Sequence, residues 1–309
     1  MSGENDGIGT GQGMTTDSHL RSRSEQGRRD RRWPEEPQPL AVAVYDNHTH
    51  LEVADGDDPL DVATQLARAA AAGVRGVVQV GTDVPTSIWS AELAAVEPRV
   101  LAAVAIHPND APELAAAGEL DAALETIAEL AARPRVRAVG ETGLDFFRTG
   151  EDGRDAQFAS FEAHIDIAKR TATALQIHDR DAHDEVVETL LRVGAPEKTV
   201  FHCFSGDADL ARLCAEHGWY LSFAGTVSFS NAGRLREALA VAPRDLVLVE
   251  TDAPYLTPTP FRGRPNAPYL IPYTLRSMAA TLDVAEDELA ASIAANTERV
   301  YGSWDEDLA

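Results

Sequence analysis

The sequence has few cysteines and no long hydrophobic run. Its two cysteines, Cys203 and Cys214, match neither a zinc-binding knuckle nor a disulfide framework, which favours a reducing compartment. No apolar segment is long enough to cross a membrane, and the first residues lack the hydrophobic core of a signal peptide. We therefore expect a cytoplasmic protein with no membrane partner, and the sequence indicates no obligate protein partner.

Positive charge is also scarce. The 27 basic residues are outnumbered by 50 acidic ones, which gives a formal net charge of −23. A protein that coats nucleic acid needs a cationic surface, so that class is disfavoured. An enzyme that meets phosphate through bound metal and a few arginines is not excluded. Only Lys169 and Lys198 are lysines, so nearly all of the positive charge is arginine.

The order of the segments predicts the fold. Residues 1–38 are rich in Gly, Ser, Arg and Glu without a hydrophobic period, which predicts a disordered extension. From there on, apolar strand-like runs alternate with segments of helical periodicity. The strand-like runs lie near 41–46, 74–80, 99–106, 136–140, 173–178, 198–203, 219–224 and 245–251. We predict an α/β fold, a (β/α)8 TIM barrel forming a single domain over 39–309. The competing doubly wound sheet lacks its glycine-rich phosphate loop.

Polar side chains follow the predicted strands at their carboxyl ends, where barrel enzymes place their chemistry. His48 and His50 end the first strand and point to one side of it, because residues two apart share a face. The candidates on later strands are His107, Glu141, Asp145, His178, His202 and Asp252. Five of the nine histidines thus gather on one rim. Imidazoles with carboxylates indicate divalent-metal ligands, and so many of them suit two ions bridged by a carboxylate and a water.

Six short blocks resemble, in the correct order, the signature blocks of the TatD-type metal-dependent deoxyribonucleases of the amidohydrolase superfamily. The blocks are DNHTHL, GETGLDFFR, IHDRDA, HCFSG, ETDAPYL and RGRPNAP, and the match runs from about residue 43 to 302. The resemblance implies a TIM barrel that hydrolyses phosphodiester bonds of DNA with divalent metal and a metal-bridged water. It also implies 3′–5′ exonuclease activity on single strands.

The same resemblance implies a ligand set for two ions. By matching motif, the ligands are His48, His50, Glu141 and Asp252 for one ion and Glu141, His178 and His202 for the other. The identity of the two ions stays open among Mg, Mn, Zn and Ni. Related hydrolases of cyclic amides often bridge their metals with a carboxylated lysine. Here Lys169 lies within a predicted helix and Lys198 at the start of a strand, which favours Glu141 as the bridge.

Two of the ligands are also expected to act in catalysis. Glu141 would bridge the ions, and Asp252 would accept the proton of the attacking water. A purely ligating role for Asp252 stays open. Cys203 follows His202 on its strand, so its side chain is expected to face the opposite way, toward the helices.

Substrate contacts are expected from side chains close to these ligands. Arginine suits phosphate because its planar fork donates two parallel hydrogen bonds. The candidates are Arg148, Arg180 and Arg262, each of which could instead pair with one of the abundant acids. His107 is expected to face the substrate rather than to bind metal, and a structural role is the alternative that stays open. Phe146 or Phe147 could stack on a base.

Two alternatives remain at this stage. A two-metal hydrolase of a small phosphoester, nucleotide or amide would use the same ligands, and the strong negative charge favours it slightly because DNA would be repelled. A cluster of the three arginines around the mouth would favour DNA instead. A non-catalytic protein on a barrel scaffold is ranked low, because such a protein would have lost ligands and all six are present.

Overall fold

Eight parallel strands lie side by side in the order in which they occur along the chain. The structure is a computed structural model that describes residues 19–23 and 29–305. The strands of the sheet are β2 (Val44–Thr49), β4 (Val74–Val80), β5 (Val100–Val104), β6 (Val136–Asp145), β7 (Ala174–Arg180), β8 (Thr199–Phe201), β9 (Tyr220–Phe223) and β10 (Val247–Val249). Past β10, the His50 amide donates to the Ala253 carbonyl at 2.8 Å and the Asp252 amide to the His48 carbonyl at 3.0 Å. These bonds close the sheet on β2, and the predicted TIM barrel is confirmed.

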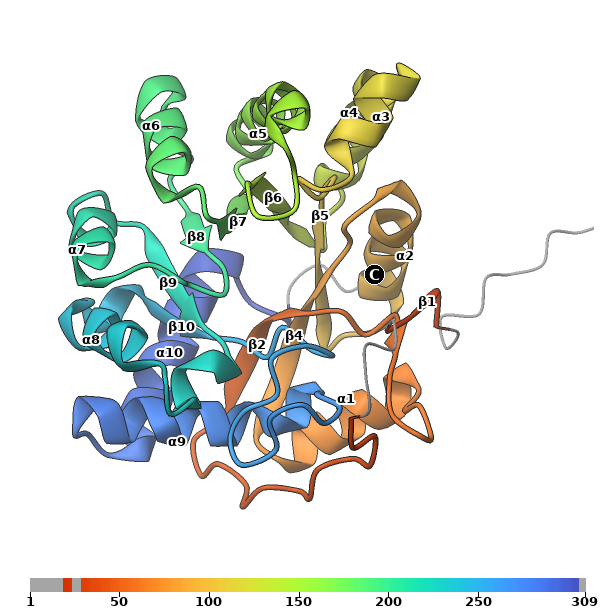
Figure 1. Cartoon of the computed structure of the whole chain (residues 1–309). Coiled ribbons are helices and arrows are strands. Elements are labelled where there is room, and N and C mark those ends of the chain that lie inside the picture. Colours follow the sequence, from red (N-terminus) through yellow and green to blue (C-terminus); the bar gives the residue numbers. More distant parts are fainter. Residues whose placement is uncertain (1–18, 24–28, 306–309) are drawn as a thin grey trace, which may run out of the picture.

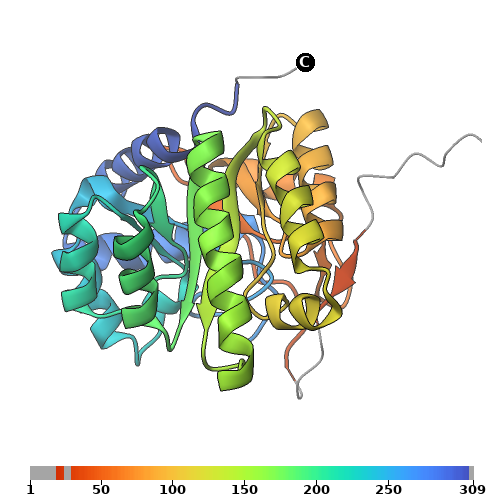
Figure 2. The same ribbon diagram turned by 90° about the horizontal axis from the view of Figure 1, so that it is seen from above.

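Helices surround the strands on the outside, as Figures 1 and 2 show. They are α1 (Val62–Ala71), α2 (Val84–Val96), α3 (Ala111–Ala117), α4 (Leu120–Ala131), α5 (Glu151–Thr171), α6 (His183–Val193), α7 (Ala208–Glu216), α8 (Gly233–Val241), α9 (Ile271–Leu282) and α10 (Glu286–Tyr301). Short 3-10 helices are η1 (Gly225–Ser228), η2 (Arg244–Leu246) and η3 (Pro268–Leu270). No helix within the described ranges is long and apolar enough to span a membrane.

Several helices begin where an aspartate follows a strand. The Asp83 carboxylate accepts from the Thr86 amide at 2.7 Å, and the Thr86 hydroxyl accepts from the Asp83 amide at 3.1 Å, so the two residues form a capping box for α2. The Asp207 carboxylate caps α7 by accepting from the Asp209 and Leu210 amides. These caps begin α2 and α7 in the loops that follow β4 and β8.

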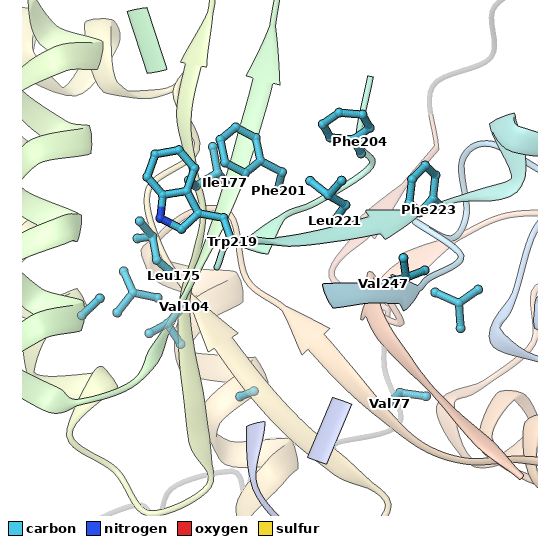
Figure 3. Close-up of a cluster of buried hydrophobic side chains, with 14 of the residues drawn as sticks. Val77, Val104, Leu175, Ile177, Phe201, Phe204, Trp219, Leu221, Phe223 and Val247 are labelled. Carbon is cyan, nitrogen blue, oxygen red and sulfur yellow. The ribbon is translucent and has the colours of Figure 1, made fainter. Parts of the chain in front are cut away.

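The main core lies between the strands and the helices. Figure 3 shows part of it, with Leu175 and Ile177 of β7 and Phe201 of β8 beside Trp219. Strands covered by helices read as continuous apolar runs, which is why the sequence revealed them. Inside the barrel the packing is polar in places, since the Gln176 amide donates to the Asn47 carbonyl at 2.7 Å.

The N-terminal strap, as we call residues 19–23 and 29–38, lies against the barrel. Its strand β1 (Arg21–Ser22) pairs in parallel with β3 (Val53–Ala54), in the loop after β2. The Tyr269 hydroxyl donates to the Pro34 carbonyl at 2.8 Å. This corrects the prediction of a disordered extension for these two stretches. The other residues of that prediction, 1–18 and 24–28, lie outside the described residues.

Candidate metal centre

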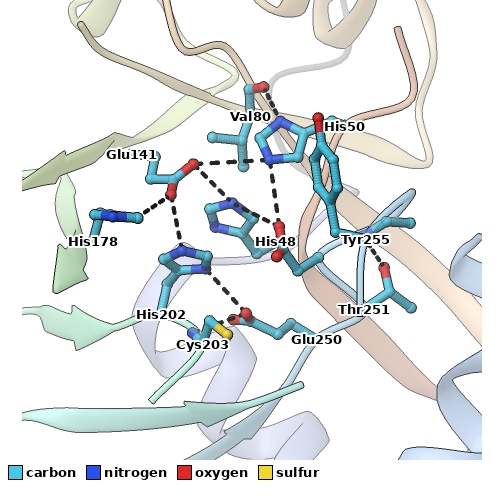
Figure 4. Close-up of polar contacts among 12 residues, drawn as sticks. His48, His50, Val80, Glu141, His178, His202, Cys203, Glu250, Thr251 and Tyr255 are labelled. Atoms are coloured by element: carbon cyan, nitrogen blue, oxygen red, sulfur yellow. Dashed lines mark hydrogen bonds and ion pairs between the residues drawn. The ribbon is translucent and has the colours of Figure 1, made fainter. Parts of the chain in front are cut away.

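The carboxyl ends of five strands bring the six predicted ligands together at the barrel mouth. Figure 4 shows the imidazoles turned toward one carboxylate, that of Glu141. The six side chains come from β2 (His48, with His50 just past it), β6 (Glu141), β7 (His178) and the loops that follow β8 and β10 (His202, Asp252). All are buried or nearly so, since the most exposed of the six, His178, keeps only 16% of its side chain accessible.

Glu141 divides the histidines into two sets, one for each of its oxygens. Its Oε1 lies 2.6 Å from His178 Nδ1 and 3.0 Å from His202 Nε2. Its Oε2 lies 3.7 Å from His48 Nε2 and 3.8 Å from His50 Nε2. A carboxylate with nitrogen donors grouped at each oxygen has the arrangement that a bridge between two ions requires.

Asp252 completes the set on the Oε2 side. Its Oδ1 lies 3.5 Å from His50 Nε2 and 4.0 Å from His48 Nε2. By distance to the two Glu141 oxygens the four histidines group as the family resemblance implies, but His202 of the second set also lies close to His48 and Asp252. The donor atoms of His48, His50 and Glu141 lie within 4.8 Å of one another, as do those of His48, His202 and Asp252.

The surroundings of His48 indicate whether this site fits a metal. Both of its ring nitrogens are buried and make no hydrogen bond within the part of the chain that the structure describes. Buried polar atoms are normally satisfied, and burial together with the His202 charge lowers the pKa of His48, so its imidazole is neutral. A neutral, unsatisfied imidazole among carboxylates is ready to ligate a cation, and the residues present fit a metal site.

Charges in the site are strongly coupled. Burial disfavours the ionised form of Glu141, but His107 and His202 outweigh it and hold the pKa of this carboxyl well below its usual range. Burial likewise opposes the charged form of His178, yet hydrogen bonds to Asp145 and Glu141 raise its pKa to about 9. Without metal, the Glu141 carboxylate is therefore neutralised by protons on its histidine neighbours.

Metal binding should release a proton, because a ligating imidazole must be neutral. With its pKa of about 9, His178 is protonated at neutral pH, so affinity should rise with pH until His178 deprotonates. The raised pKa also stabilises the metal-free fold below about pH 6.5, and this contribution is lost as the pH rises through about 9. Calorimetric titration in two buffers of different ionisation enthalpy counts the protons. A pH-independent affinity would contradict the assignment.

Two acids that the sequence analysis passed over orient the ligands. Glu250 is fully buried, its Oε1 lies 3.0 Å from His202 Nδ1, and it also accepts from the Cys203 amide at 2.9 Å. Asp46 is equally buried and accepts from the His48 amide at 3.3 Å. Burial raises the pKa of Asp46 to about 8. Each acid stands two residues before a ligand in its motif, a spacing that could have drawn attention to it.

The substitution Glu250→Gln should weaken metal binding by about 10- to 100-fold, because partners that fix a ligating histidine commonly contribute that much. The amide would no longer hold the His202 ring through a charged hydrogen bond. Competition with a chelating dye measures the affinity. The matched control is Glu237→Gln, an exposed acid on α8. Equal metal affinities in the two variants would show that Glu250 fills space in the core and does not orient His202.

Asp145 and His107 lie beside the same site. Asp145 Oδ2 is 3.2 Å from His178 Nε2 and accepts from the Asn109 side-chain amide at 3.0 Å, so it orients a candidate ligand and orders its loop. His107 Nε2 lies 3.3 Å from Glu141 Oε1. With Glu141 and His178 it forms a third group able to hold an ion, a possibility that the prediction of a substrate-facing role did not include.

The three predicted substrate arginines are all exposed, and none forms an ion pair within the described residues. The structure thus does not show the alternative in which these arginines pair with surface acids. Arg180 lies 4.0 Å over the ring of Phe147, and Arg262 lies 4.3 Å over the ring of Phe229. Arg148 donates its amide to Asp145 Oδ1 at 2.8 Å, which places it on the same side of the mouth as Arg180.

Phe146 and Phe147 differ in exposure: the Phe146 ring packs against the protein, and the Phe147 ring is exposed. Phe146 packs edge-on against Phe158, at 6.2 Å between ring centroids. Phe147 is 63% exposed at the mouth. Of the two candidates for base stacking, only Phe147 is accessible.

Cys203 corrects a prediction. It was expected to face the helix layer, but β8 ends at Phe201, so the alternation of a strand does not extend to it. Its φ of 41° turns the chain, and its partly exposed side chain lines a cavity beside the metal centre. The buried cysteine of the helix layer is Cys214.

Neither lysine reaches the metal centre. Lys169 Nζ, near the end of α5, donates to the Val193 carbonyl at 2.6 Å. Lys198 directly precedes β8, at the opposite end of the barrel from the ligands. No lysine can therefore take the place of Glu141 between the two sets of histidines.

The N-terminal strap fastens the two loops that follow His50 and Asp252. Arg21 forms an ion pair with the fully buried Glu52. Arg23 Nη1 bonds Asp55 Oδ2 at 3.2 Å and the Pro254 carbonyl at 2.6 Å. Arg29 Nη1 bonds the same Asp55 oxygen at 3.0 Å. The arginine cluster of the predicted tail thus lies beside the first ligand set.

Comparison with known proteins agrees with this geometry. Residues 45–302 match the model of a family described as TatD related DNase. The uncharacterized metal-dependent hydrolase TatD of Mycobacterium tuberculosis is 46% identical over 84% of this chain and 98% of its own length. The 3′-5′ ssDNA/RNA exonuclease TatD of Citrobacter rodentium is 36% identical over 77% of this chain and 90% of its own length.

The solved structures agree as well. The structure of YJJV, a TatD homologue from Escherichia coli, aligns with a TM-score of 0.74 at 28% identity, covering 84% of this chain and 98% of that one. The family match begins at residue 45, so the N-terminal strap lies outside it. The barrel with its metal centre, by contrast, lies within the matched region, and this chain belongs to the TatD-related DNase family of metal-dependent hydrolases.

Proposed function

We propose that this protein is a deoxyribonuclease that removes nucleotides from the 3′ end of single-stranded DNA with two divalent ions. The observation that carries the proposal is the position of Glu141, whose two oxygens each face a separate set of histidines. Three exposed arginines that pair with no acid among the described residues, together with the exposed Phe147 ring, add contacts for phosphate and base. The exonuclease from Citrobacter rodentium supports the substrate.

Two ions bound here would lower the pKa of a water molecule and neutralise the phosphate. Glu141 holds its place between the histidine sets through short contacts to His178 and His202. Asp252 keeps 14% of its side chain exposed, so its carboxylate can accept the proton that the attacking water loses. Arg148 and Arg180 would orient the phosphate from the β6–β7 side of the mouth.

The role of Asp252 can be separated from ligation. The substitution Asp252→Asn should lower the rate of hydrolysis by at least about a hundred-fold, the usual contribution of a general base, while both ions remain bound. Metal content and single-turnover rates are measured on the same preparation. A nearly normal rate with full metal content would assign Asp252 to ligation alone.

The proposal as a whole is tested with metal-stripped protein and oligonucleotides labelled at either end. Mg, Mn, Zn or Ni is added back separately, which also identifies the working metal. We expect stepwise shortening from the 3′ end that needs metal and disappears in His202→Ala. The matched control His217→Ala, at the end of α7, should behave as the wild type. Activity that survives in His202→Ala would come from a contaminant.

A small phosphoester, nucleotide or amide is the second candidate substrate, and the net charge of −23 favours it. Intact DNA together with metal-dependent cleavage of a small phosphodiester would select this candidate. We further propose a cytoplasmic location, because Cys203 and Cys214 are both free thiols.

A further inference from the structure

A large cavity opens beside the metal centre, where the first turns of α6, α7 and α8 meet η1. Its volume is about 920 Å³, within the range of sites for small organic ligands. Cys203 lines it, and this residue directly follows the ligand His202. The cavity therefore lies one residue away from a candidate metal ligand. We call it the side cavity.

Apolar groups form much of the wall of the side cavity. The apolar side chains that line it are Val187, Phe204, Leu210, Leu213, Phe229 and Leu235. The Asn231 amide and the Thr226 hydroxyl also line it, and neither side chain has a hydrogen-bond partner among the described residues. Aromatic and aliphatic walls with a few free donors and acceptors suit a flat heterocycle such as a nucleobase.

Acidic side chains predominate among the charged groups that line the side cavity. Asp184, Glu188, Asp207 and Asp209 line it, and all four are at least partly exposed. The basic side chains of the lining are paired, Arg234 with Asp207 at 3.1 Å and His183 with Asp179 at 2.6 Å. Beside the cavity, Arg262 lies over the ring of Phe229 at 4.3 Å. A phosphate is thus favoured beside Arg262 and disfavoured among the acidic side chains of the lining.

We propose that the side cavity binds the base and sugar of the terminal nucleotide, next to the phosphodiester that the metal centre hydrolyses. The inference rests on the proposed function and adds to it. The acidic lining disfavours a further phosphate, so we expect the strand to end in the side cavity. Selection of a chain end then follows from charge as well as from shape.

The first test compares two oligonucleotides that differ only at the end, one with a 3′-hydroxyl and one with a 3′-phosphate. We expect kcat/KM to be at least about tenfold higher for the 3′-hydroxyl, since several carboxylates around the side cavity repel the added phosphate charge. In the double variant Asp184→Asn with Glu188→Gln, the ratio should fall toward one. Equal rates in the wild type, or an unchanged ratio in the variant, would overturn the proposal.

The second test probes the wall. Phe229→Ala should raise KM for the oligonucleotide by about tenfold, in line with the contribution of a stacked base. The rise for methyl p-nitrophenyl phosphate, which carries no base, should be much smaller. Leu191→Ala, an exposed leucine on α6 outside the side cavity, is the matched control and should change neither. Equal rises for both substrates would overturn the proposal.

Binding separates this inference from the proposed function. Equilibrium dialysis of labelled thymidine against the metal-free protein should show binding that Phe229→Ala abolishes and that a 3′-phosphate weakens. If DNA is not cleaved but thymidine still binds, the proposed function fails and the side cavity stands. If DNA is cleaved and thymidine does not bind, the side cavity assignment is wrong and the nuclease stands.

Discussion

Replacing Glu141 with Gln is expected to lower hydrolysis by about a thousand-fold or more and to leave a protein that cannot hold two ions. Both oxygens of Glu141 face histidine nitrogens, five in all, and an amide offers one weak oxygen in place of two charged ones. The loss corresponds to about 4 kcal/mol of transition-state stabilisation, the order of magnitude that metal ions contribute.

Metal content and activity must be followed together for this variant. Elemental analysis after dialysis against excess metal gives the stoichiometry, and circular dichroism shows whether the barrel is intact. The control is Glu298→Gln, an exposed acid paired with Arg75 away from the mouth. A variant that retains two ions per chain would show that Glu141 does not bridge them, whatever its activity.

Removing two arginines from the N-terminal strap is expected to destabilise the protein strongly. The double variant Arg23→Ala with Arg29→Ala leaves Asp55, whose side chain is 1% exposed, without its cationic partners. Leaving a buried charge unpaired costs about 3 kcal/mol, so the free energy of unfolding should fall by about that amount. Chemical denaturation followed by circular dichroism measures the change.

The same experiment has an internal control. Arg32→Ala removes an exposed arginine that pairs with Asp30, and its effect should stay below about 1 kcal/mol. Adding Asp55→Asn to the double variant removes the unpaired charge and should restore part of the lost stability. If the double variant is as stable as Arg32→Ala, the strap is not fastened through Asp55.

The sequence was sufficient to predict the barrel and to place the candidate metal ligands at its mouth, for one physical reason. Parallel strands in a barrel have their carboxyl ends at one edge, so a residue such as His178 or His202 needs only to follow an apolar run to be placed at the mouth. The motifs then supplied the division into two sets, which the distances to the two Glu141 oxygens reproduce.

What the sequence did not show depends on which segments meet in space. The strap arginines read as a solvated tail because their partners Glu52 and Asp55 lie far along the chain and follow no local period. The predicted direction of the Cys203 side chain was wrong because the amino-acid pattern does not show at which residue a strand ends. The side cavity is built by three helix starts and η1, and no single motif contains it.

The placement of the two lysines has a practical consequence. Lys169 and Lys198 are the only lysines in the chain, and Lys198 lies at the barrel end away from the ligands. Reagents that couple to side-chain amines would therefore attach the enzyme to a bead or a sensor by its base. Arginine does not react with them, so the cations at the mouth would stay unmodified. The catalytic face would point into solution, where a long polymer can reach it.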